Sequence, residues 1–221
     1  MTLRAMTGLG GAVLAALLAL AAGAWPAKAG QAVFSAARGE VVLGAEPEAP
    51  RFPASLTKLM TLHLALDAVA AGDLGWDEAI AVSRHAATAP PVRLGLRVGA
   101  EIPVRTAVHA VLVRSSNDAA RALAEAIAGS EAAFARRMTR RARALGMERT
   151  VFRNATGLPD GDHVSTAADM ARLVAALDAT HGARLRPLFR RPVSWQGASL
   201  GPRNAGAAAL PGAVLGKTGF T

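Results

Sequence analysis

A serine and a lysine three residues apart are the first pair in this sequence that could do chemistry. Ser55 and Lys58 follow Pro53 and precede a long apolar run, so the pattern predicts that both lie in the first turn of a helix. Residues three apart share a helix face, which brings the lysine amine to the serine hydroxyl. A serine becomes a nucleophile when a base takes its proton, and a lysine can be that base when burial or a second cation lowers its pKa. The pair therefore predicts a serine nucleophile and a lysine general base.

On its own, this pair is more typical of a helix cap followed by a solvated lysine. Whether Ser55 and Lys58 are catalytic therefore depends on partner residues elsewhere in the chain. One partner is the Ser-Ser-Asn sequence at residues 115–117. Ser115 can relay a proton between the base and a leaving amine. Asn117 can hold a peptide amide of a substrate, because its side chain both donates and accepts hydrogen bonds.

The second partner is the Lys-Thr-Gly sequence at residues 217–219. Lys217 is a second cation that would keep Lys58 neutral and could attract a substrate carboxylate. Thr218 adds a hydroxyl for that carboxylate, and Gly219 lets a peptide backbone lie close to the strand. We therefore expect these three residues to bind substrate.

Acyl transfer through a serine ester also needs two backbone N–H groups that stabilise the oxyanion. The N–H groups of Ser55, at a helix start, and Phe220, directly after the glycine, are the natural pair. Together the three motifs predict acyl transfer.

The composition narrows the possible function classes. The chain has 221 residues, a formal charge of +9 and no cysteine, which excludes a disulfide framework and thiolate chemistry. It has no P-loop or dinucleotide fingerprint, so we expect no cofactor. With 4% aromatic residues and no recognition motif, nucleic acid is disfavoured as a partner. A basic surface can instead contact an anionic membrane or cell-wall polymer.

The histidines show no spacing typical of metal ligands. We therefore predict no metal site and interpret His63, His85, His109 and His181 as structural or solvated. His163 is interpreted as a hydrogen-bonding residue of a loop.

The first 29 residues have the pattern of a secretory signal peptide. Arg4 is followed by an uncharged apolar stretch over residues 9–23, and Ala27-Lys28-Ala29 forms a small-x-small cleavage site. We therefore expect residues 1–29 to be removed on export and residues 30–221 to form an extracytoplasmic catalytic domain.

The remaining pattern predicts a mixed α+β fold, because strands flank a central group of helices. The expected strands are residues 32–34 and 41–43 as a hairpin, 80–82, 193–195 and 214–220. The expected helices are one from the Ser55 turn to Gly72, then 106–113, 119–128, 131–145, and one capped by Ser165 or Thr166 that ends near Leu177, with a loop over 152–163.

These motifs resemble those of the penicillin-binding D-alanyl-D-alanine carboxypeptidases, serine peptidases of family S11. The resemblance lies in residues 53–60, 115–120 and 216–221, and in the segments 152–158 and 163–167, which are similar to the family's loop opposite the nucleophile. It covers residues 31–221. The residues that it places in catalytic and binding roles are Ser55, Lys58, Ser115, Asn117, Lys217 and Thr218.

The resemblance implies a β-lactamase/DD-peptidase-like fold, with an antiparallel sheet flanked by helices, an α-helical lobe and the active site between them. It implies a periplasmic or extracytoplasmic enzyme that removes the terminal D-alanine of the peptidoglycan stem peptide. It also implies that β-lactam antibiotics acylate the same serine.

Alternative functions on this fold stay open. A D,D-endopeptidase of the same family has the same motifs, and a non-catalytic peptidoglycan- or penicillin-binding protein could share them. A class A β-lactamase is disfavoured, because those enzymes have Ser-Asp-Asn at the second motif and a loop glutamate. Here the second motif is Ser-Ser-Asn, and residues 154–158 contain no glutamate. The family usually continues past Lys-Thr-Gly with further strands and a helix, so we expect the catalytic domain to be truncated at its C-terminal strands.

Overall fold

The helix that follows Ser55 lies at the centre of the molecule. A computed structural model describes residues 31–35 and 40–202. A 3₁₀ turn, η1 (Ala54–Thr57), leads directly into helix α2 (Lys58–Ala71), which ends at Gly72 in the left-handed conformation, with φ of 81°. Glycine adopts that conformation without steric cost, so the predicted helix end is confirmed.

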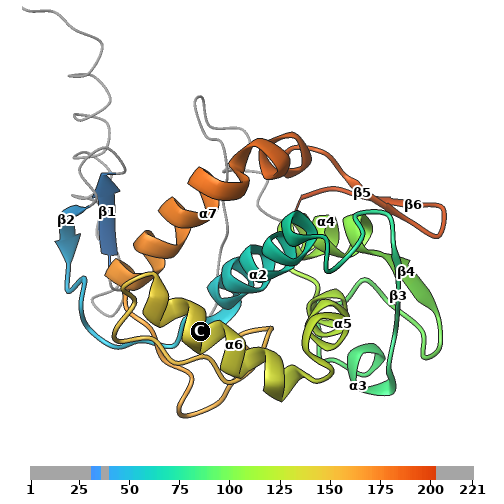
Figure 1. Cartoon of the computed structure of the whole chain (residues 1–221), viewed down its shortest axis with the longest axis horizontal. Coiled ribbons are helices and arrows are strands. Elements are labelled where there is room, and N and C mark those ends of the chain that lie inside the picture. Colours follow the sequence, from blue (N-terminus) through green and yellow to red (C-terminus); the bar gives the residue numbers. More distant parts are fainter. Residues whose placement is uncertain (1–30, 36–39, 203–221) are drawn as a thin grey trace, which may run out of the picture.

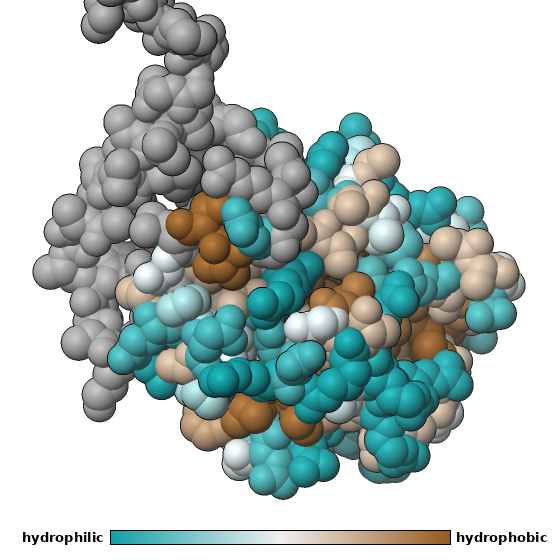
Figure 2. All heavy atoms as spheres, turned by 60° about the vertical axis from the view of Figure 1, so that its left-hand side comes forward, coloured by the Kyte–Doolittle hydropathy of each residue, from teal (hydrophilic) through white to brown (hydrophobic). Residues whose placement is uncertain are grey.

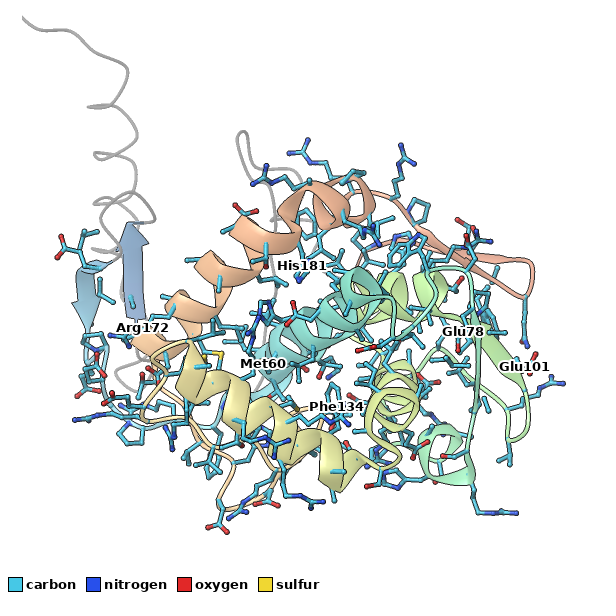
Figure 3. All side chains as sticks on the ribbon, viewed as in Figure 1. Met60, Glu78, Glu101, Phe134, Arg172 and His181 are labelled. Atoms are coloured by element: carbon cyan, nitrogen blue, oxygen red, sulfur yellow. The ribbon has the colours of Figure 1, made fainter. Side chains whose placement is uncertain are left out.

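Helices surround α2 on several sides (Figure 1). Helices α4 (Val104–Arg114), α5 (Asn117–Ala128), α6 (Glu131–Ala144) and α7 (Ala167–Phe189) all pack against it, and the short α3 (Arg84–Ala87) packs on α5. Their shared core includes Met60 of α2 and Phe134 of α6, which are fully buried (Figure 3). Glu78 and Glu101 lie exposed beside this core. Burial of one apolar face explains why these segments form helices here.

The strands form three antiparallel pairs among the described residues. These pairs are β1 (Gln31–Ser35) with β2 (Glu40–Ala45), β3 (Ala79–Ala81) with β4 (Glu101–Pro103), and β5 (Val193–Trp195) with β6 (Ala198–Leu200). The first hairpin contacts α7 through β1. The α+β class and the predicted hairpin are confirmed. The expected signal peptide and the expected strand 214–220 lie outside the described residues.

The structure differs from the predicted elements at four places. Helix α7 continues beyond Leu177 to Phe189, although Pro187 lies inside it. Its extra turns bury Leu185 and Phe189 in the core, and this packing outweighs the local cost of the proline. The prediction missed β4, β6 and α3, which are short. Such elements are too short to show a hydrophobic period.

Thr166, and not Ser165, caps the N-terminus of α7. Thr166 accepts a hydrogen bond from the Asp169 N–H at 3.1 Å, which satisfies one free donor of the first turn. Ser165 bonds the Thr150 hydroxyl instead, at 2.8 Å.

The surface is mainly polar where Figure 2 shows it, with hydrophobic side chains in small separate groups. Of the helices in the described part of the chain, none is both long enough and apolar enough to span a bilayer.

Candidate active site

Ser55 and Lys58 meet as the motif predicts. Lys58 Nζ lies 3.3 Å from Ser55 Oγ, within hydrogen-bonding distance. Ser55 is half-buried in the 3₁₀ turn, whereas Lys58 begins α2 and is only 1% exposed. Lys58 is therefore not the solvated lysine of the simpler interpretation. A buried amine in contact with a hydroxyl can accept that hydroxyl's proton.

The residue before the serine adopts an unusual backbone conformation. Ala54 has a φ of 45°, in a region that residues with a Cβ seldom occupy. Such a conformation costs on the order of 1 kcal/mol and persists only where its surroundings enforce it. Here Ala54 is the first residue of η1, and its carbonyl group lies directly against Gly157.

A loop distant in sequence holds the amine of Lys58. Lys58 Nζ donates a hydrogen bond to the Thr156 carbonyl at 2.6 Å. One turn further along α2, the Thr61 hydroxyl donates to the Ala155 carbonyl at 2.7 Å. Two consecutive loop carbonyls thus bind two consecutive turns of one helix. This arrangement orients the Lys58 amine toward Ser55.

Asn154 shapes this loop. Its side-chain oxygen accepts the N–H groups of Thr156 at 3.1 Å and Gly157 at 2.6 Å, and its amide donates to the Leu158 carbonyl at 3.0 Å. Asparagine side chains commonly stabilise a turn in this way. The Asn-x-x-Gly sequence was therefore a detectable signal for the turn, but it did not indicate which side chain the loop carbonyls would bind.

A buried histidine joins the same loop region to the serine turn. His163 Nε2 lies 2.9 Å from Thr57 Oγ1, and Nδ1 accepts the Arg153 N–H at 3.4 Å. Since Nδ1 is the acceptor, Nε2 carries the proton and donates to Thr57. Burial lowers the pKa of His163 to about 4. His163 is therefore neutral at neutral pH and positions the turn, in agreement with its interpretation as a loop hydrogen-bonding residue.

Ser115 and Asn117 lie at the junction between α4 and α5, two helices that both pack on α2. Ser115 ends α4 in the left-handed conformation, with φ of 60°, and its buried hydroxyl has no hydrogen-bond partner among the described residues. Asn117 donates through its side chain to the Pro90 carbonyl at 2.9 Å. Its backbone N–H donates to the Val92 carbonyl at 2.7 Å. The junction is thus anchored through Asn117, while the Ser115 hydroxyl keeps its hydrogen-bonding capacity.

Asp118 supports the same junction from inside. This fully buried carboxylate accepts the N–H groups of Leu94 and Gly95, each at 2.9 Å, and Leu96 at 3.0 Å. These hydrogen bonds hold the loop over residues 94–96 against the start of α5. Hydrogen bonds to a charged acceptor are stronger than those between neutral groups. The sequence motifs alone do not indicate this role of Asp118. Its position directly after the Ser-Ser-Asn motif was the available signal.

The structure thus brings Ser55 and Lys58 into contact and places Ser115 and Asn117 on helices that neighbour α2. Lys217, Thr218, Gly219 and the Phe220 N–H lie outside the described residues, so their contribution to the site stays a prediction.

Comparison with known proteins agrees with these features. The sequence model of the family described as D-alanyl-D-alanine carboxypeptidase, peptidase S11, matches residues 21–221. D-alanyl-D-alanine carboxypeptidase DacF of Bacillus subtilis is 38% identical over 125 residues, which cover 57% of this chain and 32% of that protein. A D-alanyl-D-alanine endopeptidase of Pseudomonas aeruginosa is 35% identical over 139 residues, which cover 62% of this chain and 43% of that protein. The chain therefore matches less than half the length of either relative.

The fold has solved counterparts. The structure of penicillin-binding protein D2 from Listeria monocytogenes in its cefotaxime-bound form superposes with a TM-score of 0.77 and 32% identity. The match covers 90% of this chain and 81% of that one. The expected β-lactamase/DD-peptidase fold is thereby confirmed. The chain belongs to the D-alanyl-D-alanine carboxypeptidase family, peptidase family S11.

Proposed function

We propose that this chain is a serine-type D-alanyl-D-alanine carboxypeptidase that acts on peptidoglycan stem peptides through an acyl-enzyme on Ser55. The observation that carries the proposal is the buried Lys58 amine, 3.3 Å from Ser55 Oγ and bonded to the Thr156 carbonyl at 2.6 Å. Burial away from water disfavours the charged form of an amine, which is what a general base requires. The carboxypeptidase relative from Bacillus subtilis supports the substrate class.

In the first half-reaction, Lys58 takes the proton of Ser55 as Oγ attacks the carbonyl carbon of the terminal D-Ala-D-Ala amide. The N–H groups of Ser55 and Phe220 stabilise the oxyanion. When the C–N bond breaks, the proton passes from Lys58 through Ser115 to the leaving D-alanine amine. The product is an ester between Ser55 and the shortened peptide. Water then cleaves this ester and restores the Ser55 hydroxyl.

On this proposal, four residues of the chain bind the substrate. Asn117 holds a peptide amide of the stem, while Lys217 and Thr218 bind the terminal carboxylate and Gly219 allows the close approach. A β-lactam presents a carboxylate and an amide in a comparable arrangement, so it acylates the same serine. The penicillin-binding protein of similar structure, solved with cefotaxime, supports this part of the proposal.

Two measurements test the enzyme. A fluorescent penicillin labels the native chain, and Ser55→Ala abolishes the labelling; equal labelling of both would refute Ser55 as the nucleophile. D-alanine release from a stem pentapeptide then separates an enzyme from a protein that only binds. Labelling without release favours the non-catalytic alternative.

A D,D-endopeptidase is the second candidate, because the Pseudomonas aeruginosa relative is an endopeptidase. Cross-linked muropeptide dimers distinguish the two activities. An endopeptidase converts the dimer to monomers, whereas a carboxypeptidase releases D-alanine from the monomeric pentapeptide and leaves the cross-link intact.

Export to the periplasm or another extracytoplasmic space completes the proposal, with residues 1–29 removed as a signal peptide. The cell-wall substrate and the apolar stretch over residues 9–23 support it. Removal of Arg4 and Lys28 with residues 1–29 leaves a formal charge of 9 − 2 = +7, which favours peripheral contact with anionic membrane or wall polymer. N-terminal sequencing of the chain recovered from the periplasmic fraction tests export; a chain that keeps Met1 in the cytoplasm contradicts it.

A further inference from the structure

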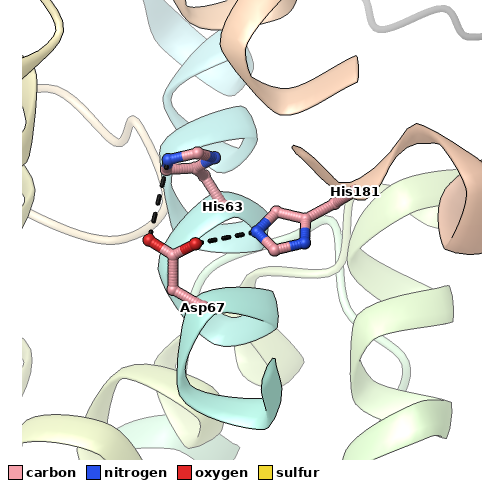
Figure 4. Close-up of side chains that lie close together, drawn as sticks. All are labelled: His63, Asp67 and His181. Atoms are coloured by element: carbon pink, nitrogen blue, oxygen red, sulfur yellow. Dashed lines mark hydrogen bonds and ion pairs between the residues drawn. The ribbon is translucent and has the colours of Figure 1, made fainter. Parts of the chain in front are cut away.

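A cluster of two histidines and one aspartate lies between α2 and α7, away from Ser55. His63 and Asp67 are one turn apart on α2, and His181 projects toward them from α7 (Figures 3 and 4). His181 Nε2 is 2.8 Å from Asp67 Oδ1, and His63 Nε2 is 3.7 Å from Asp67 Oδ2. We call these three residues the His–Asp cluster. His181 is 114 residues away from Asp67 along the chain, so no local spacing in the sequence groups these residues.

The cluster is distinct from the proposed active site. Asp67 is nine residues after Lys58, which in an α-helix is two and a half turns, or about 13 Å along the axis. The two side chains therefore leave α2 on opposite faces. The mechanism proposed above uses none of the three residues, so their juxtaposition needs a separate explanation.

The donor atoms suit a transition-metal ion. One ligand atom from each residue lies within 4.8 Å of the other two. In a tetrahedral zinc site with bonds of about 2.0–2.1 Å, ligand atoms are roughly 3.4 Å apart. Modest side-chain rotation can close that difference. Two imidazoles and one carboxylate, with a fourth position left for water, are a ligand set that zinc commonly takes.

The protonation state of His63 also suits metal binding. Arg141 Nε, which can only donate, is 3.0 Å from His63 Nε2, so Nε2 carries a lone pair. The other ring nitrogen, Nδ1, is buried without a hydrogen-bond partner in the described part of the chain. A metal ion binds an imidazole through such a free lone pair.

Arg141 contacts two of the three residues of the cluster. Besides bonding His63, its Nη2 atom is 2.9 Å from Asp67 Oδ2. The Arg141 side chain is 35% exposed, so it can leave the cluster for solvent. Asp67 also borders a hollow of about 460 Å³, lined by Ala71 and Arg137 among others.

We propose that His63, Asp67 and His181 bind a divalent transition-metal ion of the zinc class, and that the Arg141 guanidinium is the group displaced by it. The ion would join α2 to α7 and so stabilise the helical lobe, independently of the chemistry at Ser55. The proposal differs from the expectation from sequence that the histidines bind no metal.

Calorimetric titration of the metal-free full chain with ZnCl₂, together with thermal unfolding with and without zinc, tests the site. We expect binding with one ion per chain and a rise in the midpoint of unfolding, because a ligand that binds only the folded state stabilises it. His181→Ala should weaken zinc binding by about tenfold or more, and Arg141→Leu should strengthen it by a comparable factor, the usual effect of partners around a metal site.

His85→Ala is the matched control. His85 also pairs with a carboxylate, Glu131 at 2.6 Å, but forms no such three-residue group in the described structure. Its replacement should leave zinc binding unchanged. His181→Gln and circular dichroism of each variant show whether lost binding reflects a lost fold.

The proposal is overturned if the native chain and both folded His181 variants bind zinc with equal affinity. So does binding that His85→Ala removes, or binding that appears only after Arg141 is replaced. Absorption of the Co²⁺-substituted chain gives a second readout: visible bands of tetrahedral intensity are expected, and bands unaffected by His181→Gln contradict the site.

Discussion

Gly157 lies directly against Ala54, the residue that precedes the proposed nucleophile. A Cβ atom at position 157 would be 1.7 Å from the Ala54 carbonyl oxygen and 2.8 Å from Thr57 Oγ1. Gly157 also has a φ of 79°, which side chains with a Cβ disfavour. The loop that holds Lys58 can therefore approach the serine turn only because this residue is glycine.

Gly157→Ala should consequently disrupt both the fold and the site. We expect the free energy of unfolding to fall by about 3 kcal/mol, from overpacking and backbone strain together. Penicillin labelling should fall as well, because the Thr156 carbonyl next to it moves away from Lys58. Urea unfolding and gel fluorescence measure the two effects.

Gly161→Ala is the matched control for that change. Gly161 lies in the same loop region, but a Cβ there would meet nothing within 4 Å. The variant should unfold and label like the native chain. If both alanine variants behave alike, close packing of Gly157 does not control the site.

The two neighbouring serines at the α4–α5 junction offer a test of the proton relay. Ser115 and Ser116 both have buried hydroxyls without partners among the described residues. Ser115→Ala should slow D-alanine release by about 10²–10⁴-fold, the usual contribution of general acid–base catalysis. Ser116→Ala should leave the rate within a factor of about three, because no role in proton transfer is assigned to it. Steady-state assays with a stem pentapeptide compare the two, and equal losses would remove Ser115 from the mechanism.

Asp118→Asn should destabilise the junction. Its Oδ1 atom accepts the N–H groups of Leu94 and Ala119, and Oδ2 accepts those of Gly95 and Leu96. The asparagine amide would turn an N–H donor toward two of these donors. We expect the free energy of unfolding to fall by about 2–3 kcal/mol, as for buried groups left unpaired.

Asp73→Asn serves as the control for Asp118, because Asp73 is exposed. Its unfolding free energy should change by less than about 0.5 kcal/mol. Chemical denaturation at constant pH measures both variants. A stable Asp118→Asn protein would show that the loop over residues 94–96 does not depend on the carboxylate.

His163 should make the stability of the chain depend on pH. Burial lowers its pKa from 6.5 in the unfolded chain to about 4 in the folded chain. The unfolded state therefore binds the proton first, and stability that is fully present above pH 6.5 is lost as the pH falls toward 4. The full effect is about 3 kcal/mol.

The difference in unfolding free energy between the native chain and His163→Asn, measured as a function of pH, isolates the contribution of His163. The variant should be less stable at pH 7, since the bond to Thr57 is lost, but its stability should fall less steeply between pH 6.5 and 4. If the unfolding free energies of the native chain and His163→Asn fall in parallel between pH 6.5 and 4, His163 does not titrate as its burial implies.

The sequence by itself determined the local features of this protein. Ser55 and Lys58 meet because residues three apart share a helix face, and Gly72 ends their helix. For the cap of α7, the sequence indicated two adjacent hydroxyl residues, Ser165 and Thr166, and the structure selects Thr166. The α+β class followed from the order of strand and helix patterns. These features depend on short-range geometry, which repeats whenever the same residues occur at the same spacing.

Only the tertiary structure decided which distant groups meet. Lys58 bonds a carbonyl 98 residues away, His163 reaches Thr57 across 106 residues, and His181 joins Asp67 across 114. The length of α7 beyond Leu177 likewise depends on the core into which Leu185 and Phe189 pack. Such contacts depend on how whole helices pack against one another, and no local spacing in the sequence encodes that arrangement.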